Sequence, residues 1–197
     1  MPHISSAADG EFLHNLTWVI SNLCRNKPVP DWRLIGPLLE PLRCLLKHDV
    51  MPDVVTDACW AISYLSDASE RHVQAVCESP DILARLVELV SSGERKFVLP
   101  ALRALGNILT GSDSQTQMAI DAGFLAALPP LLNSRHQSVL KEACWALSNI
   151  TAGTRSQCRQ AVELGVLERV VEILETSEFK IQKVRTFRNV DLKNLTF

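Results

Sequence analysis

The stretch Lys141-Glu-Ala-Cys-Trp-Ala-Leu-Ser-Asn-Ile-Thr-Ala-Gly153 has the pattern of an amphipathic helix that carries a tryptophan among its polar residues. Spacings of three and four residues place Glu142, Trp145 and Asn149 on one face of such a helix. The other side holds three apolar residues, Ala143, Leu147 and Ile150. Packing alone rarely selects a tryptophan one turn before an asparagine on a polar face. The stretch therefore predicts a helix with one face for a core and another for a ligand.

The same pattern recurs along the chain at a nearly constant interval. Trp18, Trp60, Arg103 and Trp145 follow one another after 42, 43 and 42 residues. A period of about 40–47 residues built from two or three helices is typical of armadillo and HEAT arrays, in which stacked units share one core. We therefore predict an all-α fold, a right-handed armadillo-repeat superhelix (an α-solenoid) of about four repeats.

The predicted repeat domain covers residues 1–183, and residues 184–197 form a tail without repeat character. The domain comprises a partial first unit, the third helix at 11–26, and further units at about 31–68, 69–111, 112–153 and 154–183. Prolines and glycines mark the expected helix ends. We expect one helix over 34–47, another that begins at Pro52, Ser79 as an N-cap before Pro80, and Gly111 as a C-terminal stop.

The composition is that of an ordinary soluble protein, with 47% hydrophobic and 21% charged residues. A formal charge of −2 gives no basic field for nucleic acid, whereas a locally acidic groove suits a basic ligand. No signal peptide opens the chain, and the most apolar run, 123–132, is too short to span a bilayer. Six cysteines without zinc-like spacing indicate reduced core thiols in the cytosol or nucleus: Cys24, Cys44, Cys59, Cys77, Cys144 and Cys158.

Stacked third helices would align equivalent residues into three ladders. The tryptophan ladder is Trp18, Trp60, Arg103 and Trp145. The asparagine ladder, one turn later, is Asn22, Tyr64, Asn107 and Asn149. The acidic ladder, one turn earlier, is Asn15, Asp57, Pro100 and Glu142. We expect all three to lie on the inner surface, with Arg103 and Asn107 on the exposed face of their helix.

Each ladder suits the same ligand, an extended peptide rich in Lys and Arg. Parallel indoles accept the methylene stem of a basic residue and attract its cation. Asp57 and Glu142, with Asp53 and Asp113 nearby, can pair with the terminal charge. Asparagine side chains can bond the N–H and C=O groups of the peptide backbone. Arg103 would weaken the binding of a cation at its own position.

Two other interpretations of these residues compete with a groove. A single tryptophan at helical spacing is more often a core residue than part of a binding site, and Trp32, outside the ladder, is interpreted as core. An enzyme is disfavoured, because the sequence has no Ser/His/Asp or Cys/His grouping, no phosphate-binding glycine loop and no metal set. We therefore expect no catalytic residue, no metal and no cofactor, and interpret none of the five histidines as a ligand.

The third-helix segments resemble importin-α (karyopherin-α), the armadillo adaptor of nuclear import. The resemblance runs from about Ser5 to Lys183 and is carried by four segments: Asn15-Leu-Thr-Trp-Val-Ile-Ser-Asn-Leu-Cys-Arg-Asn26, Asp57-Ala-Cys-Trp-Ala-Ile-Ser-Tyr-Leu-Ser-Asp67, Ala101-Leu-Arg-Ala-Leu-Gly-Asn-Ile-Leu-Thr-Gly111 and Glu142-Ala-Cys-Trp-Ala-Leu-Ser-Asn-Ile-Thr-Ala-Gly153. It implies a receptor in the cytoplasm and nucleus that holds nuclear localisation signals (NLS) and passes cargo to importin-β.

The resemblance also implies which residues bind the signal. One group resembles the downstream half of the family's major site: Trp18, Asn22, Arg25, Asp57, Trp60 and Tyr64. A second group resembles the upstream half of its minor site: Arg103, Asn107, Thr110, Gly111, Glu142, Trp145, Ser148 and Asn149. The break in the tryptophan ladder at Tyr64 and Arg103 resembles the family's segment between the two sites.

The sequence departs from the family pattern at both ends. The basic importin-β-binding segment and the first repeats are expected to be absent, and Phe187 and Asp191 stand where the period predicts Trp and Asn. We expect a truncated gene model or splice form with half-built sites and weaker binding. Two alternatives stay open: a structural or regulatory fragment without productive signal binding, and a catenin-like scaffold, which the ladders disfavour.

Overall fold

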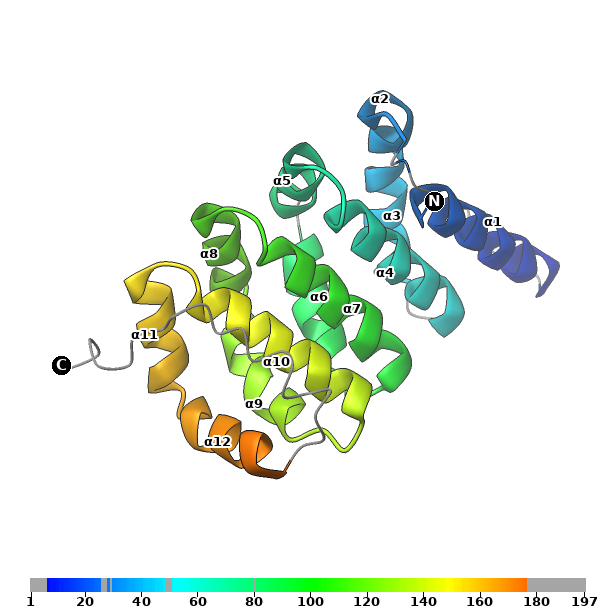
Figure 1. Cartoon of the computed structure of the whole chain (residues 1–197). Coiled ribbons are helices and arrows are strands. Elements are labelled where there is room, and N and C mark those ends of the chain that lie inside the picture. The colour runs from blue at the N-terminus through cyan, green and yellow to red at the C-terminus, as the bar shows by residue number, and fades with distance from the viewer. Residues whose placement is uncertain (1–6, 26–27, 29, 49–50, 80, 177–197) are drawn as a thin grey trace.

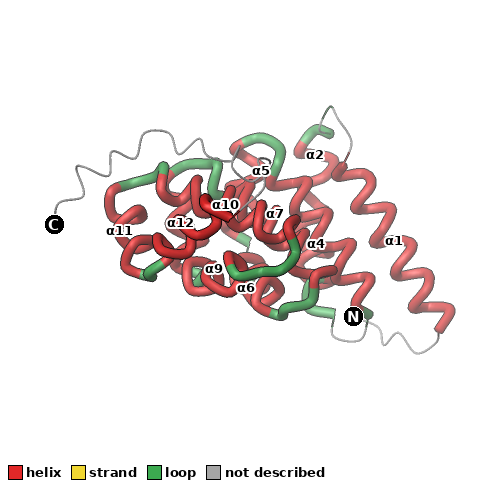
Figure 2. Tube along the Cα trace, turned by 60° about the horizontal axis from the view of Figure 1, so that its bottom comes forward, coloured by secondary structure: helices red, strands yellow, loops and turns green. Residues whose placement is uncertain are grey.

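The computed structural model describes residues 7–25, 28, 30–48, 51–79 and 81–176, and all regular elements in these residues are helices. The helices stack in a row, as Figures 1 and 2 show. Helix α1 (Ala7–Arg25) lies at one end, and α11 (Arg155–Glu163) and α12 (Val166–Thr176) lie at the other. This arrangement confirms the predicted all-α solenoid. The predicted tail at 184–197 lies outside the described residues.

The helices fall into groups of three that repeat along the stack. The first helices of successive units are α2 (Trp32–Ile35), α5 (Glu70–Glu78), α8 (Asp113–Asp121) and α11. The second helices are α3 (Leu39–Leu45), α6 (Ile82–Ser91), α9 (Phe124–Leu132) and α12. The long third helices are α1, α4 (Pro52–Ser66), α7 (Arg95–Ile108) and α10 (Gln137–Thr151). Each third helix contacts the next, so the third helices lie side by side along the stack (Figure 1).

The turns and helix starts within the units depend on a few local residues, which recur with the period of the repeat. Asp81, Gly123 and Gly165 adopt positive φ angles of 65°, 97° and 71° at the turn between first and second helices. Ser112 and Thr154 begin α8 and α11 with capping boxes, in which each side chain accepts from a backbone N–H. The same kinds of turn and cap therefore recur at equivalent places in successive units.

The structure confirms one expected helix boundary and corrects two. Pro52 stands in the first turn of α4, as predicted. Ser79 is not the N-cap of α6, because the chain first passes through the left-handed conformation at Asp81 and the helix begins only at Ile82. Helix α7 ends at Ile108, three residues before the predicted stop at Gly111, which does not have a positive φ.

The helix predicted over 34–47 is divided into three parts. It consists of α2, the 3₁₀-helix η1 (Gly36–Leu38) and α3. Pro37 lacks the N–H that an α-helix needs at this point, so the chain tightens into a 3₁₀ turn. Gly36 is required beside it, because a Cβ at this position would stand 2.7 Å from Cε2 of Trp32.

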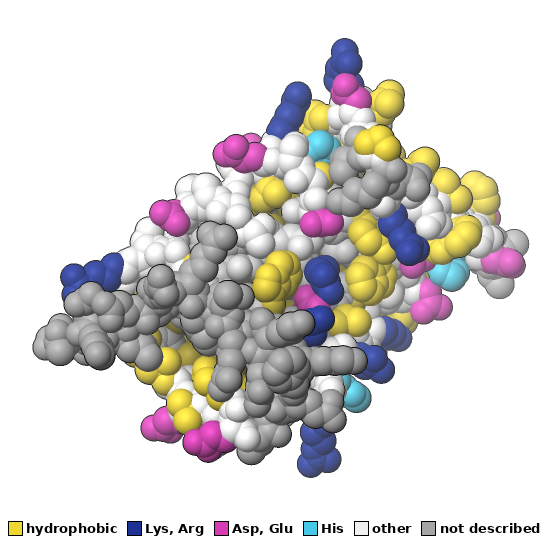
Figure 3. Space-filling view, viewed as in Figure 1, with side chains coloured by type: hydrophobic (Ala, Val, Ile, Leu, Met, Phe, Trp, Pro, Cys, Tyr) yellow, Lys and Arg dark blue, Asp and Glu magenta, His cyan; other side chains and the backbone are white. Residues whose placement is uncertain are grey.

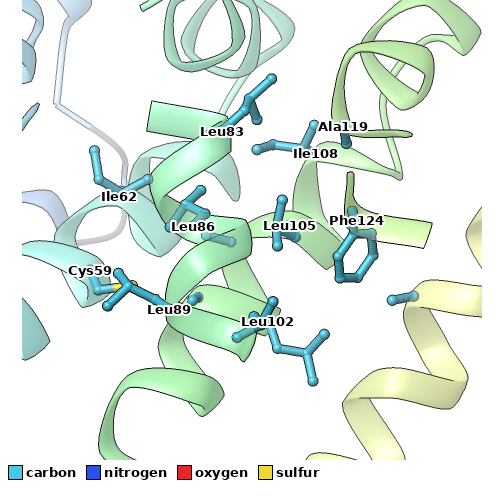
Figure 4. Packing of buried hydrophobic residues seen from close by; sticks show 14 of the residues in the cluster. Cys59, Ile62, Leu83, Leu86, Leu89, Leu102, Leu105, Ile108, Ala119 and Phe124 are labelled. Atoms are coloured by element: carbon cyan, nitrogen blue, oxygen red, sulfur yellow. The ribbon is translucent and has the colours of Figure 1, made fainter. Parts of the chain in front are cut away.

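One continuous core runs between the layers and joins the units. Ile62 of α4, Leu86 of α6, Leu105 of α7 and Phe124 of α9 meet there, all fully buried (Figure 4). Burial of each such side chain contributes roughly 1.5–3 kcal/mol relative to exposure. Because these residues come from different units, the units stabilise one another.

Each of the six cysteines is buried or partly buried. All six cysteines are free thiols, and burial raises the pKa of Cys24, Cys77 and Cys144 to about 11. These three thiols are therefore protonated at neutral pH. In the described part of the chain no group of His, Cys, Asp or Glu side chains is arranged to hold a metal ion. None of the described helices combines the length and apolarity needed to cross a membrane.

Candidate peptide-binding groove

The tryptophan ladder is carried by the third helices α1, α4, α7 and α10, with one residue on each. Figure 3 shows hydrophobic and basic side chains next to one another over α4 and α7. Trp18 is exposed, whereas Trp60 and Trp145 are half-buried. The two half-buried indoles therefore each keep part of their surface accessible.

Trp60 is supported by the next turn of its own helix. The rings of Trp60 and Tyr64 stack with centroids 6.0 Å apart and planes inclined by 23°. Stacking of this kind holds both rings in fixed orientations. It joins the tryptophan and asparagine ladders at α4 into one aromatic surface.

Arg103 and Glu142 form an ion pair between adjacent helices. The Arg103 guanidinium donates to Oε1 of Glu142 at 2.6 Å and lies 5.7 Å from the ring centroid of Trp145. A residue of the chain itself thus supplies a cation beside the Trp145 indole. This geometry fits the expectation that Arg103 opposes a ligand's cation at its own position.

The carboxylates of the acidic ladder are partly removed from water. Burial raises the pKa of Asp57 and of Glu142, while the nearby His14 and Arg103 respectively oppose that shift. Asp57 Oδ2 lies 3.2 Å from Nε2 of His14. Oε2 of Glu142 is buried and has no hydrogen-bond partner among the residues that the structure describes. Glu142 therefore retains capacity for a further donor.

Two members of the asparagine ladder, Asn107 and Asn149, tie their third helix to the preceding one. Nδ2 of Asn107 donates to the carbonyl of Ser63 at 2.9 Å, and Nδ2 of Asn149 donates to the carbonyl of Gly106 at 3.3 Å. The same bond thus recurs one unit later. Asn22, on the first described third helix, bonds the carbonyl of Trp18 in its own helix instead.

Asn107 is buried, which corrects the prediction that Arg103 and Asn107 both lie on the exposed face of α7. Its side chain is only 6% exposed, whereas Arg103 is exposed as expected. The close approach of α4 covers Asn107, and its amide joins the two helices. Asn149 is half-buried, so it remains accessible from the groove.

A hollow of about 580 Å³ opens between the C-terminal ends of α7 and α10. Six predicted site residues line it: Thr110, Gly111, Asp113, Trp145, Ser148 and Asn149. Sequence reasoning missed four more lining residues: Leu109, Thr116, Ala152 and Gly153. Gly153 follows Gly111 by one 42-residue period, which is a signal that could have found it. Both glycines leave room for a buried glutamine of the next helix, Gln115 or Gln157, whose Oε1 a Cβ would overlap.

A second hollow, of about 440 Å³, lies one unit earlier and shares Thr110 and Gly111 with the first. Asp67 and Glu70 give it an acidic lining that sequence reasoning did not single out. The remaining predicted residues line neither hollow: Asn15, Trp18, Asn22, Arg25, Asp53, Asp57, Trp60, Tyr64, Arg103, Asn107 and Glu142. The structure therefore gathers one compact subset of the predicted site, at the α7–α10 junction.

Comparison with known proteins agrees with this architecture. The family model for the Armadillo/beta-catenin-like repeat matches residues 35–67 and 112–152. Importin subunit alpha-1b of Oryza sativa subsp. japonica is 45% identical over 121 residues, which is 61% of this chain and 22% of that protein. Importin subunit alpha-3 of Arabidopsis thaliana is 46% identical over 109 residues, 55% of this chain and 20% of that protein. The aligned segment thus spans about a fifth of these relatives.

Solved structures show the same fold. A designed armadillo repeat protein in complex with the peptide (KR)4 has a TM-score of 0.83 and 27% identity, covering 96% of this chain and 82% of that one. A computationally designed armadillo repeat protein for modular peptide recognition has a TM-score of 0.78 and 27% identity, covering 91% and 74%. The predicted armadillo architecture is therefore confirmed.

Proposed function

Because the chain is an armadillo-repeat protein related to the importin-α subunits, we propose that it is a nuclear import adaptor that binds Lys/Arg-rich localisation signals. The observation that carries the proposal is the hollow at the α7–α10 junction, where Trp145, Ser148 and Asn149 face Thr110 and Asp113. The related designed protein in complex with (KR)4 supports a basic peptide as the ligand. The proposal places the protein in the cytoplasm and nucleus.

The lining of this hollow suits one lysine of an extended peptide. The Trp145 indole offers an apolar surface for the methylene stem, and the Asp113 carboxylate and Thr110 hydroxyl can accept from the ammonium. The Asn149 amide group already bonds α7, so its Oδ1 is the atom that accepts from a peptide N–H. Because Asn149 would bond the peptide backbone while Trp145, Asp113 and Thr110 contact the lysine, the neighbouring peptide positions need no particular side chain.

Fluorescence anisotropy with a labelled Lys/Arg-rich peptide tests the proposal. Replacing Trp145 and Asn149 together by alanine should weaken binding at least about tenfold, equivalent to roughly 1.4 kcal/mol. The pair Trp18 and Asn22, replaced in the same way, tests the α1 end of the ladders. Glu88→Gln, on the exposed side of α6, is the matched control and should bind normally.

Two outcomes would overturn the proposal. One is a helical, folded chain that does not bind the peptide at high concentration, which favours a structural fragment or a scaffold. The other is binding that neither double substitution alters, because the ligand would then lie elsewhere. A glutamate-rich peptide of equal length controls for non-specific attraction and should not bind.

A further inference from the structure

Gln157 of α11 is buried beside the hollow at the α7–α10 junction, with 1% of its surface exposed, and it is not one of the residues that line the hollow. Its Oε1 accepts from the backbone N–H of Thr154 at 2.9 Å. Its Nε2 donates to the backbone carbonyl of Asp113 at 2.8 Å and to Oε1 of Gln117 at 3.2 Å. The buried amide therefore uses its acceptor and both of its N–H donors.

The bonds of Gln157 reach two walls of the hollow. Asp113 is the first residue of α8 and lines the hollow on that side. Gly153 lines it after the end of α10, directly before Thr154, and has no side chain where Oε1 of Gln157 lies. One buried side chain thus links the start of α8 to the turn that follows α10. Because its amide is fully bonded and buried, it holds these two walls at a fixed separation.

The preceding unit shows which part of this arrangement belongs to the repeat. Gln115, 42 residues earlier, is also 1% exposed, lies beside Gly111 and completes the capping box of Ser112. Its Nε2 donates to the side chain of Gln74 at 2.8 Å. Capping and packing beside a glycine are therefore common to both units. In the described part of the chain, the bond from this glutamine to the backbone of an acidic residue in a hollow is found at Gln157 alone.

We propose that Gln157 is a positioning residue of the peptide site, which holds Asp113 at the distance from Trp145 that a bound lysine spans. The inference rests on the proposed function, in which the Trp145 indole packs on the methylene stem and the Asp113 carboxylate accepts from the ammonium. The stem sets how far the ammonium lies from the indole, so a shift of Asp113 weakens the charge-assisted bond. Gln157 does not touch the peptide and acts through Asp113.

A double-mutant cycle, measured by fluorescence anisotropy with the labelled Lys/Arg-rich peptide, tests this role. Gln157→Met keeps the size of the side chain and removes its bonds, so affinity should fall about threefold to tenfold, the range that one hydrogen bond accounts for. Asp113→Asn removes the carboxylate and should also weaken binding. Because Gln157 acts through Asp113, the double variant should bind no more weakly than Asp113→Asn alone.

Two further variants separate positioning from stability. Gln157→Glu retains the capping box, since glutamate caps as glutamine does, but its carboxylate cannot donate to the Asp113 carbonyl, so it should weaken binding as well. Thr154→Ala removes the hydroxyl that accepts from the backbone N–H of Gln157 at 3.3 Å and leaves the bonds of the Gln157 side chain in place. It should lower the urea midpoint through loss of the cap and yet bind peptide normally. Circular dichroism checks that each variant is helical, and Gln157→Glu takes the place of Gln157→Met in the cycle if the latter does not fold.

Hydrogen exchange followed by mass spectrometry, without peptide, measures the link itself. The backbone amides in the first turns of α8 should exchange faster in Gln157→Met and Gln157→Glu than in the unchanged chain, because the start of the helix is no longer held by α11. In Thr154→Ala they should exchange as in the unchanged chain. Unaltered exchange in both Gln157 variants would overturn the inference.

Failure of this inference is distinguishable from failure of the proposed function. If the unchanged chain does not bind the peptide, the proposed function is wrong and this inference is wrong with it. If the unchanged chain binds, three results overturn the inference alone: normal binding by the Gln157 variants, losses from Gln157→Met and Asp113→Asn that multiply in the double variant, or a loss in Thr154→Ala as large as that in Gln157→Met.

Discussion

Gly106 of α7 lies directly against the indole of Trp145 in α10, so that ring atoms Cζ3 and Cε3 occupy the space a Cβ at residue 106 would need. Trp145 forms one wall of the larger hollow. The absence of a side chain at Gly106 therefore determines how deeply the indole lies against α7 and how wide the hollow is. A residue outside the hollow thus sets the shape of the proposed site.

The substitution Gly106→Ala should separate binding from stability. The new methyl group displaces the indole, so we expect peptide affinity to fall roughly five- to tenfold, about 1–1.4 kcal/mol. Alanine favours the helix by up to about 1 kcal/mol over glycine, which offsets part of the packing strain. Urea denaturation should therefore change little while anisotropy shows weaker binding. Unchanged affinity would mean that the Trp145 position does not matter to the peptide.

The two bonded asparagines should respond in opposite ways. Asn107→Ala removes a buried bond to the Ser63 carbonyl and should lower the free energy of unfolding by about 1–2 kcal/mol. Asn149→Ala removes a longer bond at a half-buried position and should cost less stability but more peptide affinity. Denaturation and anisotropy on both variants check this. If the two variants lost the same stability and the same peptide affinity, the structural role of Asn107 and the binding role of Asn149 would be contradicted.

The ladders could be predicted because a repeat needs only equivalent positions, and the third helices indeed lie in register. How deeply each ladder residue is buried could not be predicted from the sequence, because burial depends on how closely the preceding helix approaches. Asn107 is covered by α4, and Glu142 is covered in part by Arg103, although both belong to polar columns. Thr116 was missed because its equivalent one period later is Cys158, so no polar residue recurs at this position to mark it.

Peptide affinity should depend on pH through Glu142. Burial raises the pKa of this carboxyl above its ordinary 4.5. As pH falls, Glu142 is therefore protonated earlier than an exposed glutamate, and its attraction for a cationic peptide is lost first. We expect affinity to be constant near neutral pH and to decline as pH approaches this raised pKa from above. Glu142→Gln should bind more weakly at neutral pH and show a flatter profile, and parallel profiles would exclude this role.

Acid stability should be limited by His72, which lies at the junction of α2 and α5. The imidazole is buried, its Nδ1 is 2.7 Å from Oγ of Ser69, and its ring meets that of Trp32 edge-on at 4.8 Å. Nε2 is buried without a hydrogen-bond partner in the part of the chain that the structure describes. Burial, aided by the charge of Arg71, lowers the pKa of His72 below its ordinary 6.5. The folded protein therefore favours the neutral ring.

A lowered pKa in the folded state means that the unfolded chain binds the proton more readily. The stability that the neutral ring provides is thus fully present above pH 6.5 and is lost as pH falls toward the folded pKa. The loss from one group is at most about 1.4 kcal/mol per pH unit. His72→Gln cannot titrate, so urea denaturation at pH 7.5, 6.0 and 5.0 should show a smaller decline for this variant than for the unchanged chain. His136→Gln, at an exposed position, serves as the control, and equal declines for the unchanged chain and His72→Gln would show that another group sets the acid limit.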